Sequence, residues 1–548
     1  MAAPEQRNEE NHIQEESTTN AIGGSAALIS VCVLASRVTG FVRTWAMAWA
    51  LGATFLASSY QVANNLPNML YELAVGGMLV TAFLPVYVSV KKKGGAEAGN
   101  RYASNLMSIT VVFMGIISLL CILFSAQLIY TQSFMSDQGA MDVSVFFFKF
   151  FAIQVVFYGA SAILSGLLNA NRDFLWSSIA PAFNNVIAII TFVAYALVAP
   201  SNPELALWII AIGNPLGVFC QMAIQIPALR RNGVNLTFRI DFKDPALRET
   251  LSIGVPALLV MVMSFGIVSV QNAVALSCAE NGPSVMLYAR LWFTLPYAFL
   301  AVPITTAMFT ELAEMNADDA KDDFRRGVTD GTRQIIFLTA PFALFLMVFS
   351  LPLVSLYHAG SFDTQSVELV ANYLVFLAFS LPLYGVNTYL QKIFSALREM
   401  KRFAAINLAC AAAQIAFTMI LGGLFANNPA GLAFVALGEL VFYVVSDVLC
   451  FTYLRCRFGV LGLMGILKSL VAGLLLGAAG AGVGGALMYG ASLLMGGFSY
   501  QIWQALILLL VGGIPAVLVT FGLAIKLHIP GADFILGIVA KVKGKLGR

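Results

Sequence analysis

Charged side chains are rare inside the strongly apolar stretches of the sequence, and seven of them stand out. A charge inside a membrane-spanning helix costs about 2.5–3.5 kcal/mol on insertion scales, so it needs an ionic partner or a water-filled cavity. These side chains are therefore the first candidates for chemistry. They are Arg37, Arg43, Glu72, Lys149, Arg290, Lys392 and Glu439.

Arg37 and Arg43 share the segment SRVTGFVR. On an ideal helix their spacing separates them by about 9 Å along the axis and about 120° around it. Gly40 lies between them and would permit a locally broken helix that turns both guanidinium groups toward one cavity. Because planar guanidinium groups fit phosphate oxygens, the two arginines predict an anion site. The alternative is a structural role in buried ion pairs, with Glu72 as the obvious partner.

The other charged candidates have competing interpretations. Arg290, in LYARLWFTLP, either completes a cationic central cleft or extends toward the membrane surface. Lys149 and Lys392 are interpreted as residues that anchor span ends. Glu439 is interpreted as an acid that binds an ion or a proton, or as a structural residue.

Polar and helix-bending residues of the first two apolar stretches are candidates for lining a cavity or forming its gate. These residues are Ser36, Gly40, Asn65, Pro67, Asn68 and Glu72. A bent helix is useful where a gate must open, and four residues predict a bend in the second stretch. They are Pro67, Gly76, Gly77 and Pro85.

The sequence lacks the motifs of the common catalytic and metal sites. It contains no glycine-rich phosphate loop, no His-Glu-x-x-His helix and no nucleophile elbow. The three histidines, His12, His358 and His528, stand far from the other candidates, and the seven cysteines are scattered in apolar runs. We therefore expect neither an enzyme nor a bound metal or cofactor.

Composition places the chain in a membrane. Of its 548 residues, 59% are apolar and 11% are charged, whereas about 25% of the residues of a soluble domain are charged. So few charges exclude a soluble enzyme, a nucleic-acid-binding protein and a disulfide scaffold. About fourteen apolar stretches are long enough to span a bilayer as helices, which predicts an all-α polytopic membrane protein. The stretches are 25–52, 56–90, 102–132, 142–170, 176–199, 204–229, 249–278, 283–313, 331–357, 365–397, 402–426, 430–454, 462–491 and 500–527.

Lysine and arginine occupy alternate connections between these stretches, from Lys91 in the first basic connection to Arg457 in the last. The positive-inside rule then places both termini in the cytoplasm. Residues 1–24 are acidic and predict a disordered tail, and residues 528–548 predict a basic amphipathic tail.

Two pairs of short segments suggest an internal repeat. NNLPNML matches FTLPYAF, and LNANRDF matches FSALREM at nearly the same offset. Chance matches are the alternative. The repeat predicts two pseudo-symmetric six-helix lobes, 25–229 and 249–457, joined by a cytoplasmic linker over 230–248 and followed by two extra helices within 458–527.

Five motifs in the same order and spacing resemble the MurJ/MviN lipid II flippases of the MOP exporter superfamily, and LPNMLYELAVGG resembles the actinobacterial branch. The motifs are SRVTGFVR, ANNLPNMLYELAVGG, LYARLWFTLPYAFLAVPITTAMF, LYHAGSFDT and FSALREMKRFAAIN. The resemblance implies two lobes around a cationic cavity and two further helices that form a groove for the lipid tail. Family arginines proposed to hold a diphosphate match Arg37 and Arg43, and Arg290 matches with a one-residue ambiguity. Another family arginine is replaced here, at Tyr71 or Glu72.

The resemblance implies that the chain moves undecaprenyl-diphosphate-linked peptidoglycan precursor, lipid II, from the cytoplasmic to the periplasmic leaflet by alternating access. Arg37, Arg43 and Arg290 would bind its diphosphate. The membrane potential, Na⁺ or H⁺ could drive the cycle. The expected location is the bacterial cytoplasmic membrane, with lipid II, membrane lipids and the cell-wall synthesis machinery as partners and no nucleic acid.

Two other classes of function remain open. One is another MOP transporter, either an oligosaccharide-lipid flippase or a cation-coupled multidrug antiporter. The other is a membrane scaffold or a polyprenyl-phosphate glycosyltransferase, although a transferase should carry acidic loop residues and a metal site.

Overall fold

The computed structural model describes residue 32 and residues 34–72, 83–136 and 141–529. The predicted acidic tail over 1–24, Gly76 and Gly77 of the second span, and residues 530–548 of the basic tail lie outside this part of the chain.

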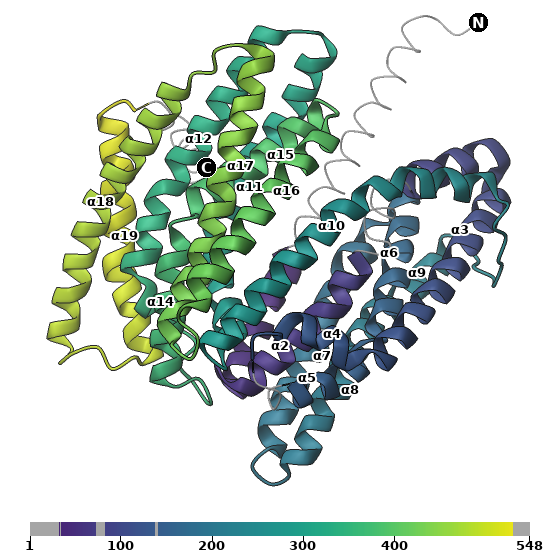
Figure 1. Ribbon diagram of the computed structural model, residues 1–548, viewed down its shortest axis with the longest axis horizontal. Helices are drawn as coiled ribbons and strands as arrows, with labels where there is room; N and C mark the ends of the chain where they lie inside the picture. Colours follow the sequence, from purple (N-terminus) through teal and green to yellow (C-terminus); the bar gives the residue numbers. More distant parts are fainter. Residues whose placement is uncertain (1–31, 33, 73–82, 137–140, 530–548) are drawn as a thin grey trace, which may run out of the picture. The chain divides into compact units, whose positions relative to one another are not determined.

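The described chain is helical, with no strand among these residues, so the predicted all-α fold is confirmed (Figure 1). Residues 34–51 form the first described helix. The next helices are α2 (Phe55–Tyr71), α3 (Leu84–Leu123), α4 (Ser125–Ser133), α5 (Met141–Phe151), α6 (Gln154–Ala170), α7 (Phe174–Val198), α8 (Pro203–Ala223), α9 (Gln225–Arg231) and α10 (Pro245–Cys278). They are followed by α11 (Gly282–Ala317), α12 (Lys321–Val348), α13 (Ser350–Ser355), α14 (Thr364–Ala378), α15 (Leu381–Ala396), α16 (Met400–Phe417), α17 (Leu432–Phe458), α18 (Leu463–Leu494) and α19 (Ile502–Lys526). A π-helical turn, Thr418–Gly422, extends α16, and a 3-10 turn, Pro429–Gly431, precedes α17.

Helices occupy all fourteen stretches predicted to span a membrane. Ten described helical segments pass a length and hydropathy criterion for spanning, and α14 with α15, bent by 54°, makes an eleventh. The remaining three are the helix over 34–51, α2 and α10. The first two are described over 34–51 and 55–72 only. In α10, the segment Val262–Cys278 qualifies only as a shorter apolar helix.

The predicted connection between the second and third spans, 91–101, contains a break inside α3. Helix α3 begins in the predicted second span, with Pro85 in its first turn, and continues into the third. It breaks at Gly95, whose φ of 76° is a left-handed value that glycine adopts without a Cβ clash. The predicted connection is therefore a helical kink.

The chain forms two compact units. Unit 1 comprises residues up to 47, 63–128 and 144–261, and unit 2 comprises residues 48–62, 129–143 and 262 onward. The two predicted six-helix lobes and the two extra helices stay a prediction, because this division runs partly through single helices.

In unit 1 the segment that follows α9 is fixed against α3. Asn105 on α3 donates to the carbonyl of Asp241 at 2.8 Å and accepts from the Asp241 amide at 2.7 Å. Ser108 accepts from the amide of Arg239 at 2.9 Å. These bonds satisfy backbone groups of a segment without secondary structure, so the basic linker has a fixed path along α3.

In unit 2 the turn that joins the first two helices is bound by helix α11 and by the turn before α14. Tyr288 on α11 donates to the Gly52 carbonyl at 2.9 Å, and the Ser361 amide donates to the Trp49 carbonyl at 2.9 Å. Gly360, at φ 61°, approaches so closely that a Cβ there would lie 2.4 Å from the Trp49 carbonyl oxygen. The LYHAGSFDT segment therefore serves as a docking turn for the connection before α2.

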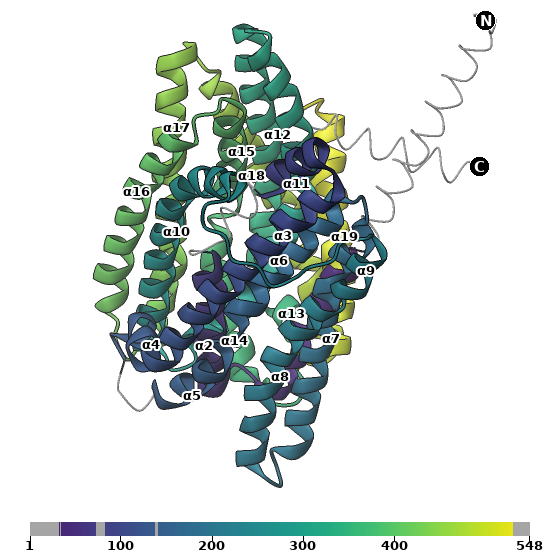
Figure 2. The ribbon, with the colours of Figure 1, turned by 90° about the vertical axis from the view of Figure 1, so that its right-hand side faces the viewer.

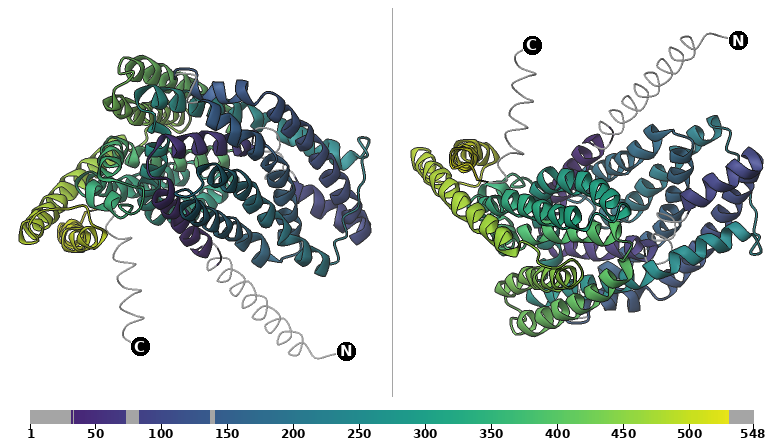
Figure 3. Two further views of the ribbon diagram at one scale, coloured as in Figure 1. Left: turned by 90° about the horizontal axis from the view of Figure 1, so that it is seen from below. Right: turned by 90° about the horizontal axis from the view of Figure 1, so that it is seen from above.

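The last two helices pair along one flank of unit 2, beside α12 (Figures 1 and 3). Figure 2 shows the same helices from the side. Their contact depends on small residues, because Gly484 and Gly512 allow the two backbones to approach each other. A Cβ on Gly484 would lie 2.3 Å from the Gly512 carbonyl oxygen. Phe349, which follows α12, packs within 3.0 Å of the same position.

Replacement of Gly484 by valine should therefore separate α18 from α19. We expect a loss of about 1–3 kcal/mol, typical of overpacking, and a lower thermal unfolding temperature of the purified protein in detergent. Gly482→Val is the matched control, because a Cβ there meets nothing within 4 Å. Equal melting of the two variants would contradict this account of the helix pair.

Candidate functional site

Arg290 on α11 and Glu439 on α17 form a two-pronged ion pair within unit 2. The Nη1 atom of Arg290 donates to Oε2 of Glu439 at 2.8 Å, and Nη2 contacts Oε1. The Glu439 side chain is 4% exposed, whereas that of Arg290 is 40% exposed. The carboxylate is thus enclosed, while the guanidinium is still accessible to a ligand.

Aromatic rings enclose the ion pair. The Arg290 guanidinium carbon lies 5.6 Å from the ring centre of Phe293, a cation–π distance. The Phe293 ring contacts Tyr384, with 5.5 Å between ring centres, and Tyr384 contacts Tyr443 at 5.4 Å. These rings exclude water and weaken dielectric screening, which strengthens the attraction between the two charges.

The pairing of Arg290 with Glu439 was not anticipated from the sequence. Arg290 was expected either to line a central cleft or to extend toward the membrane surface, and Glu439 was treated as an acid without a partner. The available signal was their opposite charge, since each intramembrane charge needs a partner. Their separation of 149 positions along the sequence gave no reason to connect them. The anion-binding role of Arg290 stays a prediction.

Arg37 and Arg43 lie in unit 1, on a helix that is unbroken from residue 34 to residue 51. The local break considered at Gly40 is therefore absent, and the two side chains project in different directions around the helix. Arg37 is exposed and Arg43 is half-buried. Neither forms an ion pair with a carboxylate of the described residues, and the pairing considered with Glu72 is not observed.

Gly40 has a different structural role. The Asn185 side chain on α7 donates to the Ser36 carbonyl and to the Thr39 hydroxyl, at 3.2 Å each. A Cβ on Gly40 would lie 3.5 Å from the same amide nitrogen. Gly40 and Ser36 thus lie at the place where α7 holds the arginine-bearing helix in unit 1.

The other cavity and gate candidates lie on or next to α2. Pro67 is buried inside α2, which remains helical through it, and Asn65 is half-buried. Asn68 and Glu72 are exposed. Their predicted roles in a cavity or a gate are not tested by this arrangement.

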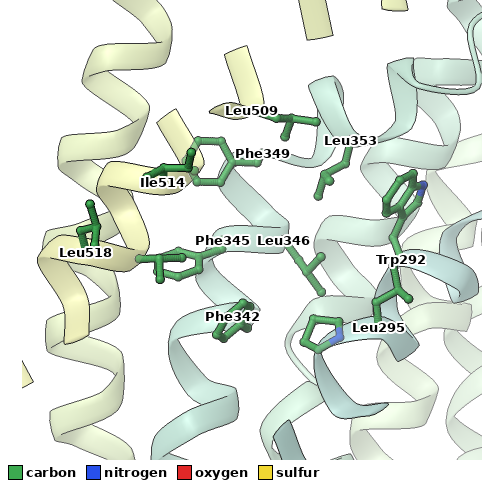
Figure 4. A pocket seen from close by; sticks show the side chains of 13 residues that line it. Trp292, Leu295, Phe342, Phe345, Leu346, Phe349, Leu353, Leu509, Ile514 and Leu518 are labelled. Atoms are coloured by element: carbon green, nitrogen blue, oxygen red, sulfur yellow. The ribbon is translucent and has the colours of Figure 1, made fainter. Parts of the chain in front are cut away.

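A cavity of about 460 Å³ opens between α11, α12 and α19 of unit 2 (Figure 4). We call it the apolar groove. In Figure 4 the rings of Phe342, Phe345 and Phe349 line the α12 side, and Ile514 and Leu518 line the α19 side. Its lining residues are Trp292, Leu295, Pro296, Phe342, Phe345, Leu346, Phe349, Leu353, Leu509, Gly513, Ile514, Val517 and Leu518. A lining of this kind suits a hydrocarbon chain.

Helix α11 connects the ion pair to the apolar groove. Arg290 and Trp292 are two positions apart, which places them about 200° apart around the helix. One face of α11 therefore presents the guanidinium, and the opposite face lines the groove. Such a helix can contact an anionic headgroup and its hydrocarbon tail together.

Comparisons with known proteins identify relatives. A family model described as "Lipid II flippase MurJ" matches residues 47–509. A "Lipid II flippase MurJ" from Burkholderia cenocepacia is 26% identical over 63% of this chain and 68% of its own. A "Probable lipid II flippase MurJ" from Rhizobium meliloti is 26% identical over 70% of this chain and 72% of its own.

Two solved structures share the fold. "Lipid II flippase MurJ, inward closed conformation" has a TM-score of 0.70 at 18% identity and covers 92% of this chain and 100% of its own. An inward-facing multidrug resistance MATE transporter of the MOP superfamily has a TM-score of 0.65 at 14% identity and covers 77% of this chain and 94% of its own. Arg290, Glu439 and most of the apolar groove lie inside the matched range 47–509, whereas Arg37 and Arg43 precede it.

A bulky side chain at Gly513 should fill the apolar groove. Gly513 lines the groove, and a Cβ there meets nothing within 4 Å, so Gly513→Phe should fold normally. We expect several-fold less labelling of the purified protein by a photoreactive long-chain hydrocarbon. Gly522→Phe, on the same helix and also unobstructed, is the control. Undiminished labelling of the Gly513 variant would mean that the chain binds elsewhere.

Removal of one member of the ion pair should cost more than removal of both. Glu439→Leu leaves the Arg290 guanidinium without its carboxylate, and the double variant with Arg290→Met removes the unpaired charge. We expect a coupling free energy of about 1–3 kcal/mol from a double-mutant cycle measured by unfolding in mixed micelles. Additive losses would mean that the two charges do not stabilise each other.

Proposed function

The chain belongs to the MurJ family of lipid II flippases, and from this membership we propose that it moves lipid II across the membrane. The observation that carries the proposal is the two-faced helix α11, which presents Arg290 on one side and the apolar groove on the other, within the range matched by the family model. Lipid II combines a diphosphate headgroup linkage with a polyprenyl tail, so its two chemical parts correspond to these two faces.

The diphosphate is bound by Arg37, Arg43 and Arg290. Arg37 and Arg43 are suited to this role because they form no ion pair with the described carboxylates. Arg290 already binds a two-oxygen anion, the Glu439 carboxylate, in the geometry that a phosphate would adopt. Arg290 keeps Glu439 on its Nη1 and Nη2 donors, and its remaining N–H groups on the exposed side bind the substrate phosphate, so the buried carboxylate stays paired.

The polyprenyl tail occupies the apolar groove between α11, α12 and α19. Each buried CH₂ group of the tail contributes about 0.8 kcal/mol relative to water, although in the bilayer the competing solvent is lipid. The groove therefore guides the tail more than it adds affinity. This arrangement leaves the headgroup to determine specificity.

Transport proceeds by alternating access of two lobes, as in transporters built from parallel repeats. Each positive charge that crosses a potential of 100 mV changes the free energy by about 2.3 kcal/mol, so a cationic site returns toward the negative side after it releases its anion. Coupling to Na⁺ or H⁺ is a further source of energy.

The protein resides in the bacterial cytoplasmic membrane with both termini in the cytoplasm. Alternate connections rich in lysine and arginine support this orientation. Lipid II enters from the cytoplasmic leaflet and leaves to the periplasmic leaflet, where the cell-wall synthesis machinery would receive it.

A cation-coupled multidrug antiporter is the second candidate, since a MATE transporter shares the fold. An antiporter for cationic drugs needs an available carboxylate, and Glu439 is neutralised by Arg290. Arg37 and Arg43 form no ion pair with the described carboxylates, and their positive charge favours an anionic substrate.

Substitution of either arginine of the first helix should slow transport strongly. Each charge-assisted hydrogen bond contributes about 1.5–3 kcal/mol, so Arg37→Ala and Arg43→Ala should each slow flipping by about tenfold to a hundredfold. The measurement is leaflet-specific quantification of lipid II in cells that depend on the variant. Arg101→Ala, which removes an exposed arginine on α3 paired with Glu97, is the control. Normal periplasmic lipid II in both variants would exclude the diphosphate role of these residues.

A further inference from the structure

A second buried acid, Asp447, lies two turns beyond Glu439 on α17. Asp447 is 6% exposed and lines a cavity of about 680 Å³ between α12, α15, α17 and α18. No ion pair with Asp447 occurs among the described residues, and its Oδ2 atom is buried without a hydrogen-bond partner. An ionised carboxylate in this state would be strongly destabilising.

The Asp447 carboxyl has a single donor nearby. Asn387 on α15 places its side-chain nitrogen 3.4 Å from Oδ1, and the same nitrogen donates to the Ser446 hydroxyl at 2.6 Å. The second contact is the shorter, so Asn387 gives the carboxyl only a weak bond. One weak neutral donor does not compensate for the loss of water around a negative charge.

Charged and titratable groups face Asp447 from few elements. Cys410 on α16 and, on α17 itself, Tyr443 and Cys450 lie close enough to interact electrostatically. The residues of α12, α15 and α18 that line the cavity are uncharged. The only cation among the described lining residues is Arg455, eight positions along α17, about 12 Å of helix rise away.

We propose that Asp447 is a proton-binding site, in which a proton on Oδ2 neutralises the carboxyl inside the apolar cavity. A sodium ion is a poorer fit because its several oxygen ligands are missing. Apart from Asp447, only the hydroxyls of Thr332 and Thr452 offer side-chain oxygen atoms among the lining residues, and the remaining walls are mostly hydrocarbon. A proton needs one oxygen and leaves no net charge.

The cavity extends from Asp447 to Arg455 and Cys456, near the end of α17 that the charge distribution of the loops places at the cytoplasm. Water that enters from this end delivers the proton, and an O–H bond forms at Oδ2. Protonated Asp447 allows α12, α15, α17 and α18 to pack closely, whereas the ionised carboxylate draws water between them. This coupling of protonation to helix packing rests on the proposed function, as a proton-dependent step of the flipping cycle.

The test uses the full-length protein in lipid nanodiscs and needs no transport. Infrared difference spectra recorded across a pH titration should contain the carbonyl band of a buried protonated carboxylic acid. This band should be absent in Asp447→Asn, which resembles the protonated acid in size and charge and should fold. Asp330→Asn, which removes an exposed acid on α12, should leave the band unchanged. A band that persists in Asp447→Asn, or one that sodium removes at constant pH, would overturn the proposal.

A second measurement examines the coupling. In reconstituted vesicles the flipping rate should change by up to about tenfold per pH unit on the cytoplasmic side, because one unit changes the ratio of protonated to ionised carboxyl tenfold. Asp447→Asn should make the rate independent of pH. An unaltered pH profile in this variant overturns the coupling. If the infrared band is lost in Asp447→Asn but the wild type does not flip lipid II, the proton site stands and the proposed function is contradicted.

Discussion

The Arg290–Glu439 ion pair reflects the constraint on which the rest of the structure depends, because a charge placed where water is scarce must be compensated. The carboxylate is nearly fully buried and would be destabilising alone, and the guanidinium compensates it with two parallel hydrogen bonds. Aromatic rings close the site on several sides. An arginine that is paired and still partly exposed has N–H groups left for a second anion, so the buried carboxylate keeps its partner.

The same constraint separates the polar and apolar parts of unit 2. Helix α11 has charge on one face and the apolar groove on the other. The groove exists because α18 and α19 pair closely through glycines, which brings Ile514 and Leu518 opposite the phenylalanines of α12. Small residues therefore determine how closely α18 and α19 pair, and large residues of α19 line the groove. In the proposed function, the anionic head of the lipid contacts one of the two faces of α11 and its long tail the other.

Sequence reasoning located all fourteen helical stretches because long apolar runs have few alternatives to membrane-spanning helices. It placed the connection between the second and third spans around Gly95, where α3 breaks, but it did not distinguish a kink from a loop, since a glycine is compatible with either. It could not connect Arg290 with Glu439, because pairing across many residues depends on tertiary packing. Asp447 was not among the charged candidates, although an acid inside an apolar stretch was the available signal.

The central claim is that the chain recognises a lipid by its diphosphate and carries it between leaflets. The most direct test reconstitutes the purified protein in liposomes with fluorescent lipid II and follows its exposure to an impermeant quencher. The account predicts rapid loss of leaflet asymmetry with lipid II and little with the matching lipid that carries one phosphate. Equal movement of the two lipids, or no protein-dependent movement of lipid II, would contradict it.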